Sequence, residues 1–186
     1  MGLLHTRIIA GLCLATMATT AFAQSESTNR VSSNTDWSVF MEDSPKECWS
    51  VSAPKETVNT RAGSVVAVSR GDILLMVFYR PGAKVKAQLT FTGGYPFAEG
   101  SNVTLMVGDS KFELFTKNVI DPKTKENIGW AWPASESDDA KVVTALKRGA
   151  QATLTARSSR GTQTKDTFSL LGFTSAIEDA EKRCGG

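Results

Sequence analysis

A serine and a lysine three residues apart form the sequence's nearest match to a catalytic motif. Ser52-Ala53-Pro54-Lys55 fits the pattern Ser-x-x-Lys, in which the lysine amine activates the serine hydroxyl as a nucleophile. The pattern needs a helix to bring both side chains onto one face, and Pro54 in a strand-rich region opposes a helix. The companion motifs Ser-Asp-Asn and Lys-Thr-Gly are absent from the sequence. We therefore interpret the segment as a loop or a strand end.

Three acidic residues lie close together at the start of a predicted helix. Glu136, Asp138 and Asp139 could act as paired carboxylates or as calcium ligands. The helix start explains them more simply, because the positive end of the helix dipole favours acidic side chains. A second acidic turn, Asp121–Asn127, lacks the ligand spacing of a calcium-binding loop. We expect no metal site and no cofactor.

The sequence contains a single histidine, and we expect the mature protein to contain none. Residues 1–23 have the features of a signal peptide, because an apolar run follows Arg7 and the segment ends in Ala21-Phe22-Ala23. Cleavage is predicted before Gln24 and removes His5. Without histidine, neither a Ser-His-Asp nor a Cys-His constellation can form. We expect a non-enzymatic protein that is periplasmic or secreted.

Export also determines the chemistry of the cysteines. Cleavage removes Cys13 and leaves two cysteines, Cys48 and Cys184. An even pair in an oxidising compartment predicts one disulfide. The bridge would enclose 137 residues, counting both cysteines, and the chain-entropy model gives about 5 kcal/mol of stabilisation for such a loop. The alternative is two separate buried thiols.

The mature chain begins with a polar segment. Residues 24–35 contain almost no apolar side chains, which predicts a flexible leader, and residues 36–186 have the length of one domain. Lys and Arg total 21 against 19 Asp and Glu, a balance that indicates no nucleic-acid partner. No segment after the signal peptide approaches the about 20 apolar residues of a membrane-spanning helix. We expect a monomer with no transmembrane segment.

Two tryptophans are the main candidates for a binding surface. Trp130 and Trp132 lie two residues apart in a predicted strand, so they point to the same face. On a wet face they could stack on a glycan or anchor a protein partner. On an inner face they would belong to the core, which we favour because aromatic side chains supply much of the buried area. Tyr95 is a further aromatic candidate, and Arg157 and Arg160 could add a basic rim unless they form an ordinary solvated surface.

The tripeptide Arg70-Gly71-Asp72 is the sequence that integrins recognise. It lies between two predicted strands. Since three-residue matches are frequent by chance, we interpret it as a tight turn and not as a recognition motif.

Alternation of apolar and polar residues from Asp36 onward predicts many strands. Lys84–Thr92 is the clearest case, and the Gly108-Asp109-Ser110 turn predicts a hairpin between residues 103–107 and 112–114. Asp72–Tyr79 is apolar on both faces, which predicts a central strand covered on each side. Further strands are predicted at residues 37–41, 48–52, 64–69, 127–132, 152–157 and 166–171. We predict a mainly β protein, an antiparallel immunoglobulin-like β-sandwich, with a barrel as the alternative.

Two short helices are predicted among the strands. The first begins near Ser137 and ends at Gly149, after a basic last turn. The second, C-terminal helix runs from about Thr174 to Arg183. Its apolar residues fall on one face, which would place Cys184 on the buried side. They are Phe173, Ala176, Ile177, Ala180 and Cys184.

The stretch from Trp37 to Arg183 resembles the invasion-associated locus B family of exported bacterial proteins. The resemblance is carried by three segments, Asp36-Trp37-Ser38-Val39, Glu47-Cys48-Trp49-Ser50-Val51 and Phe168-Ser169-Leu170-Leu171-Gly172-Phe173-Thr174-Ser175-Ala176. It implies a periplasmic, secreted or surface-associated β-sandwich with no established enzymatic activity, and some members are associated with host-cell invasion. Members often carry a cysteine shortly after the first tryptophan, where this chain has Phe40, and this departure favours the Cys48–Cys184 bridge.

We therefore expect an envelope or surface protein that binds a protein or glycan partner. The alternative is a periplasmic accessory or chaperone-like protein that captures extended segments at a sheet edge.

Overall fold

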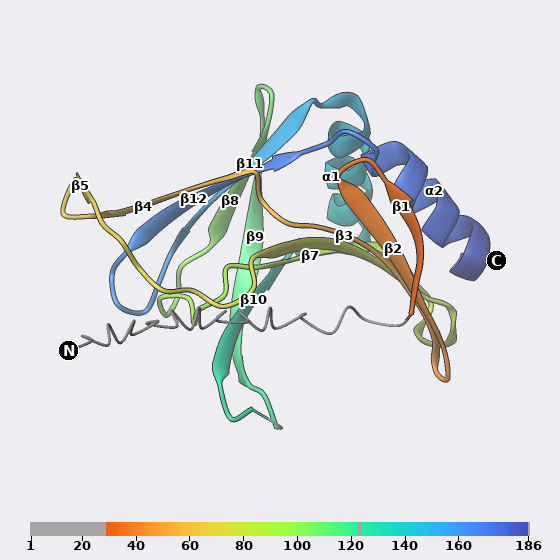
Figure 1. Ribbon diagram of the computed structural model, residues 1–186, viewed down its shortest axis with the longest axis horizontal. Helices are drawn as coiled ribbons and strands as arrows, with labels where there is room; N and C mark the ends of the chain where they lie inside the picture. The colour runs from red at the N-terminus through yellow and green to blue at the C-terminus, as the bar shows by residue number, and fades with distance from the viewer. Residues whose placement is uncertain (1–28, 123, 186) are drawn as a thin grey trace, which may run out of the picture.

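The computed structural model describes residues 29–122 and 124–185 of the chain (Figure 1). The predicted signal peptide, residues 1–23, lies outside this part of the chain. Strands and two α-helices dominate the described residues. Their bounds are β1 Arg30–Asn34, β2 Trp37–Asp43, β3 Lys46–Ser52, β4 Glu56–Arg61, β5 Ser64–Val65, β6 Leu74–Arg80, a 3-10 turn η1 Pro81–Ala83, β7 Val85–Thr92, β8 Val103–Val107, β9 Ser110–Ile120, β10 Asn127–Trp132, α1 Glu136–Arg148, β11 Gln151–Arg157, β12 Gln163–Ser169 and α2 Phe173–Cys184.

The strands form one antiparallel sheet in the order β1-β2-β3-β6-β7-β10-β9-β8-β11-β12-β4-β5. The long strand β9 joins its two halves. Residues 110–114 of β9 pair with β8, and residues 115–120 pair with β10. We call β1, β2, β3, β6, β7 and β10 the first layer, and β8, β11, β12, β4 and β5 the second layer. Figure 1 shows the helices beside β1, β2 and β3, at the opposite end of the molecule from β4 and β5.

One hydrophobic core lies between the two layers and under the helices. Phe91 on β7 and Phe168 on β12 meet edge to face, with ring centroids 6.2 Å apart, so the inner faces of the two layers pack directly on each other. This packing confirms the mainly antiparallel β architecture predicted from the alternation. The two helices, the second of them C-terminal, are also confirmed.

Helix α1 begins where the sequence predicts an acidic first turn. Ser135 is the N-cap, and its Oγ accepts a hydrogen bond from the Asp138 main-chain N–H at 3.2 Å. The apolar side of α1 packs against β7. Asp139 is also buried, and its Oδ1 accepts the Leu89 main-chain N–H at 2.8 Å.

Helix α2 buries the predicted face against β2 and β3. Cys184 and Cys48 form a disulfide with their Cα atoms 5.8 Å apart, which confirms the predicted bridge. At the other end of the helix, Phe173 meets Trp37 edge to face at 4.8 Å. The Trp37 indole N–H donates to the Ser169 carbonyl at 2.9 Å. The disulfide and the Trp37 contacts therefore hold the C-terminal helix to the first strands of the domain.

The predicted flexible leader is wrong over its last residues, because Arg30–Asn34 form strand β1. This edge strand pairs with β2 and does not need an alternating apolar face of its own. Ser32 Oγ donates to Asp179 Oδ2 on α2 at 2.6 Å, so a polar side chain fixes the strand. Strand β4 was not predicted for a similar reason, since its sequence is mainly polar, and the strand predicted over 64–69 covers only Ser64–Val65.

Candidate binding surface

Trp130 and Trp132 project from the first layer on the side away from the core. Their neighbours Gly129 and Ala131 are buried, and Ala131 lies in the core. Alternation along β10 therefore turns both tryptophans outward, where each is half-buried. The prediction that they belong to the core is wrong. The physical reason is that residues 95–97 cross the inner side of β10: a Cβ at Gly129 would lie 2.6 Å from the Phe97 ring and from the Tyr95 carbonyl oxygen.

The tryptophans continue onto β9. Trp132 lies opposite Phe115 and Trp130 lies opposite Lys117. Phe115 is 51% exposed, an unusual position for a large aromatic ring. Because directly opposed residues share a face, these side chains form one continuous outer surface.

Three more aromatic rings lie on the same outer face of the first layer. Phe40 on β2 is directly opposite Trp49 on β3, and Trp49 is opposite Phe78 on β6. The rings stack, with centroids 5.5 Å apart for Phe40 and Trp49 and 6.1 Å apart for Trp49 and Phe78. The Arg80 guanidinium lies 4.2 Å from the Phe78 ring centroid and also pairs with Glu47.

We call this surface the outer aromatic face. Its members are Phe40, Trp49, Phe78, Phe115, Trp130 and Trp132. The face also explains strand β6, which was predicted to be covered on both sides. The inner residues Leu75, Val77 and Tyr79 are buried in the core. On the outer side, Met76 is only 5% exposed, whereas Leu74 and Phe78 are half-buried. The outer side of β6 is therefore covered at Met76 and only partly covered at its two neighbours on that side.

Tyr95 does not lie on the outer aromatic face. Its ring packs edge to face on Phe97 at 5.4 Å, and its hydroxyl is hydrogen-bonded to Thr164 Oγ1 on β12. The Arg70 guanidinium carbon lies 5.0 Å from the Tyr95 ring centroid. Burial raises the pKa of Tyr95 to about 12. Tyr95 is half-buried and belongs to an internal polar cluster, away from the outer aromatic face.

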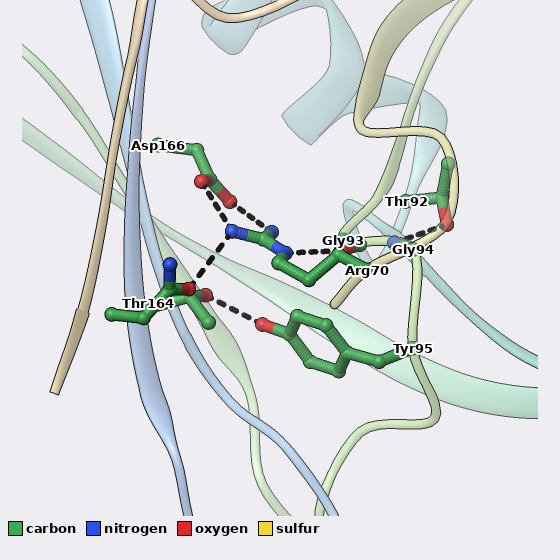
Figure 2. Close-up of polar contacts among 8 residues, drawn as sticks. Arg70, Thr92, Gly93, Gly94, Tyr95, Thr164 and Asp166 are labelled. Carbon is green, nitrogen blue, oxygen red and sulfur yellow. Dashed lines mark hydrogen bonds and ion pairs between the residues drawn. The ribbon is translucent and has the colours of Figure 1, made fainter. Parts of the chain in front are cut away.

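Arg70 is the centre of this internal cluster (Figure 2). Its two terminal nitrogens donate to the two carboxylate oxygens of Asp166 at 2.7 and 2.6 Å, and its Nε donates to the Gly93 carbonyl at 2.8 Å. The side chains of Arg70 and Asp166 are 6% and 0% exposed. Burial raises the pKa of Asp166, and the Arg70 guanidinium opposes this effect. Since its arginine is buried, the Arg70-Gly71-Asp72 tripeptide serves structure. The predicted tight turn is wrong, because residues 66–73 form an irregular segment in which the Gly71 N–H donates to the Gly94 carbonyl of another loop at 2.9 Å.

The predicted basic rim is not assembled beside the tryptophans. Arg157 is the last residue of β11, and Arg160 lies in the turn that follows. Both are exposed. Since Ala156 points into the core, Arg157 projects from the outer side of the second layer, on the opposite side of the sandwich. Of the five predicted surface residues, only Trp130 and Trp132 lie on the outer side of the first layer. The segments that carry Tyr95 and Arg157 are joined elsewhere, where the Ser159 N–H donates to the Pro96 carbonyl at 2.9 Å.

Comparison with known proteins gives a family for this chain. The family model described as invasion associated locus B (IalB) protein matches residues 37–181. The chain belongs to the invasion associated locus B family. No curated protein matches the chain. A crystal structure of invasion associated protein B from Bartonella henselae matches with a TM-score of 0.52 and 15% sequence identity, covering 81% of this chain and 95% of that chain. At this identity the likeness shows the shared fold.

The family match includes all six residues of the outer aromatic face, which lie between positions 37 and 181. The sequence pattern singled out Trp130 and Trp132 but not the other four members of this face, Phe40, Trp49, Phe78 and Phe115. Each of these four residues is next to a core residue on its strand, and the core residues are Val39, Cys48, Val77 and Leu114.

The acidic residues of this family member at the start of α1 have separate structural roles. Asp138 pairs with Lys141 at 2.9 Å and accepts from Ser135, and these contacts hold the pKa of Asp138 below its usual value. Burial raises the pKa of Asp139 to about 6, against the hydrogen bond from Leu89. Within residues 29–122 and 124–185, no three His, Cys, Asp or Glu side chains come together as metal ligands would. In the same part of the chain, neither helix is long and apolar enough to cross a membrane.

Proposed function

We propose that the protein is an exported, non-enzymatic binding module of the bacterial envelope or cell surface, which contacts a protein or glycan partner through the outer aromatic face. The observation that carries the proposal is the outward projection of Trp130 and Trp132 next to the exposed ring of Phe115. Contiguous exposed apolar surface is typical of sites that bind partners, and tryptophan is enriched at the centres of such sites.

Export and location are part of the same proposal. The signal-peptide features of residues 1–23 support transport out of the cytoplasm. The disulfide between Cys48 and Cys184 supports an oxidising compartment, the periplasm or the exterior. Cell fractionation with N-terminal sequencing tests this directly. We expect a mature monomer that begins at Gln24, and an uncleaved chain in the cytoplasm would contradict the proposal.

The binding test compares three forms of the mature protein. Immobilised wild type, Trp130→Ala/Trp132→Ala and Leu171→Ala are incubated with envelope and host-cell extracts. Leu171 is a matched control because it is an apolar side chain, 62% exposed, that follows β12 in the second layer. We expect the double variant to lose a partner that the wild type and Leu171→Ala retain. Equal capture by all three forms would remove the tryptophans from the binding surface.

Treating the extract before capture distinguishes a protein partner from a glycan partner. Protease treatment destroys a protein partner, and periodate oxidation destroys a glycan. A second variant, Phe115→Lys, places a charge on an exposed position of the outer aromatic face and leaves the tryptophans in place. Because Phe115 is half-exposed, this variant should fold, so its loss of binding would not reflect unfolding.

A second candidate function is capture of extended segments at a sheet edge. β5 pairs with β4 only at Thr60 and Arg61, so among the described strands none covers the outer edge of β4 at Glu56 and Thr57. Such an edge can accept an added strand. Light scattering by an aggregating, denatured client protein tests the idea. Edge capture predicts that the wild type suppresses aggregation and that Trp130→Ala/Trp132→Ala suppresses it equally well. Failure of the wild type to suppress aggregation would exclude this function.

A further inference from the structure

A cavity between α1 and the β8–β9 hairpin lies apart from the outer aromatic face. Its volume is about 340 Å³, near the lower end of the about 300–1,000 Å³ of small-molecule sites. The hairpin contributes Val107, Ser110 and Phe112, and α1 contributes Lys141, Thr144, Ala145 and Arg148, followed by its C-cap Gly149. A site of this size fits a small molecule and not a folded domain.

The floor of the cavity is apolar. Val107 is buried, and the half-buried rings and methyl groups of Phe112 and Ala145 pack against the hydrophobic core. Gly149 allows the helix end to approach the hairpin, since a Cβ there would lie 2.5 Å from Val107 Cγ1. The cavity therefore offers an aromatic face and aliphatic groups to the apolar part of a ligand.

The rim of the cavity carries positive charge. Lys141 and Arg148 are two helical turns apart, about 10.5 Å along the axis, and both line the cavity from α1. No aspartate or glutamate is among the described residues that line it. Lys141 is already paired with Asp138, whereas none of the described carboxylates pairs with Arg148. Both side chains are exposed, so they can turn toward a ligand.

The hydroxyl groups of the rim complete the donor pattern. Thr144 Oγ1 donates to the Ala140 carbonyl at 2.7 Å, so its proton is used within the helix. Ser110 is exposed at the start of β9, and its Oγ has no hydrogen-bond partner among the described residues. Within that part of the chain, Ser110 Oγ and the Arg148 guanidinium are thus donors without protein acceptors beside an apolar floor. This combination is complementary to an anion.

We propose that this cavity binds a small amphipathic organic anion, a carboxylate with an apolar ring or short chain. The apolar part lies on Phe112 and Ala145, and the carboxylate accepts hydrogen bonds from Arg148 and Ser110, with Lys141 adding charge. The site is separate from the outer aromatic face, and it does not depend on the function proposed for that face.

The test uses the mature protein and two probes. Fluorescence of 1-anilinonaphthalene-8-sulfonate, an apolar anion, reports binding, and octanoate competes with it. We expect one saturable site whose affinity falls with added salt, and octanoate should displace the probe more effectively than octylammonium of the same chain length. No saturable binding, or equal displacement by both compounds, would overturn the proposal.

Variants of the residues that line the cavity show whether the probe binds there. Arg148→Ala should weaken octanoate binding about tenfold, as expected for loss of a charge-assisted hydrogen bond. Lys147→Ala is the matched control, because Lys147 lies in the same turn of α1 but faces Glu178 on α2 at 3.6 Å. Thr144→Phe fills the cavity without changing charge and should abolish binding. Equal weakening by Lys147→Ala and Arg148→Ala would show only a diffuse electrostatic effect and overturn the site.

The outer aromatic face must be tested with the same probe, because it also exposes apolar rings. Trp130→Ala/Trp132→Ala should leave octanoate binding unchanged. If this variant loses the probe while Arg148→Ala and Thr144→Phe retain it, the probe binds the outer aromatic face. That result would overturn the cavity proposal and leave the proposed function standing.

Discussion

The carboxylate of Asp139 on α1 accepts the main-chain N–H of Leu89 on β7 at 2.8 Å. Asp139 is 5% exposed and Leu89 is fully buried. The hydrogen bond lies beyond the residues of β7 that pair with β10, which are Phe91 and Thr92. The helix side chain therefore satisfies a backbone donor inside the core and fixes α1 on the sheet.

The burial of the Asp139 carboxylate predicts a pH-dependent stability. The folded-state pKa of Asp139, about 6, lies above its ordinary value of 3.8 because of burial, so the folded protein binds this proton more tightly than the unfolded chain. The stabilisation is fully present below pH 3.8 and is lost as the pH rises through 6. At pH 7 the loss amounts to at most about 3 kcal/mol.

Asp139→Asn tests this prediction. The amide oxygen can still accept the Leu89 N–H, but the buried charge is removed. We expect the variant to be more stable than wild type at pH 7 and equal to it below pH 4, measured as the free energy of unfolding in urea at several pH values. Asp139→Leu is the control, since it removes charge and acceptor together. A difference between wild type and Asp139→Asn that is constant with pH would contradict the assigned pKa shift.

The Arg70–Asp166 pair predicts strong coupling between two segments that are far apart in sequence. Arg70→Met leaves the Asp166 carboxylate buried without its partner, which costs about 3–5 kcal/mol. Arg70→Met/Asp166→Leu removes both charges and should recover most of that loss. A double-mutant cycle by chemical denaturation measures the coupling. If the losses in free energy of unfolding caused by Arg70→Met and by Asp166→Leu simply add in the double variant, the pair does not stabilise the fold as the geometry implies.

The disulfide predicts a large stability difference between the oxidised and the open chain. Its cysteines are 136 residues apart in sequence, and closing so long a loop stabilises the folded state by about 5 kcal/mol in the chain-entropy model. Cys48→Ala/Cys184→Ala should unfold at a correspondingly lower denaturant concentration. Adding a thiol reductant to wild type should reproduce the effect, and the reductant should not change the variant. An unchanged midpoint in both cases would show that the bridge does not contribute.

Two glycines in the loop between β7 and β8 allow the cost of backbone strain to be measured apart from the cost of a steric clash. Gly94 and Gly100 both have positive φ, 72° and 67°. A Cβ at Gly94 would lie 2.4 Å from the Gly71 carbonyl oxygen, whereas a Cβ at Gly100 has nothing within 4 Å. Gly100→Ala should therefore lower the free energy of unfolding only by the cost of placing alanine in the left-handed conformation, about 1–2 kcal/mol. We expect a clearly larger loss for Gly94→Ala in thermal unfolding, and equal losses would contradict the close approach of the two loops.

The secondary structure that packs on the core could be predicted well from sequence. Helix α2 has its five apolar residues on one face, and all five are buried. The β8–β9 hairpin follows the predicted turn, with Val107 opposite Ser110. Periodicity is informative in these elements because one face is buried and the other is wet. Strands β1 and β4 carry mainly polar residues, so their pairing was visible only in the fold.

The candidate surface shows what periodicity cannot decide. Alternation predicted that Trp130 and Trp132 share one face of the strand. It could not decide whether that face is the inner or the outer side of the layer. The deciding contact is the packing of Phe97 on Gly129, which leaves no room for a large side chain inside. The Arg70–Asp166 pair joins residues 96 positions apart, and no local pattern indicates such a partner.

Site-specific photo-crosslinking in living cells tests the binding role of the outer aromatic face most directly. The photoreactive amino acid p-benzoylphenylalanine replaces Phe115 or Trp132 on that face, and Lys165 on the exposed side of β12 as the control. We predict a discrete crosslinked partner from positions 115 and 132 and none from position 165. The same products from all three positions, or no product from positions 115 and 132 in an exported, folded protein, would contradict the account.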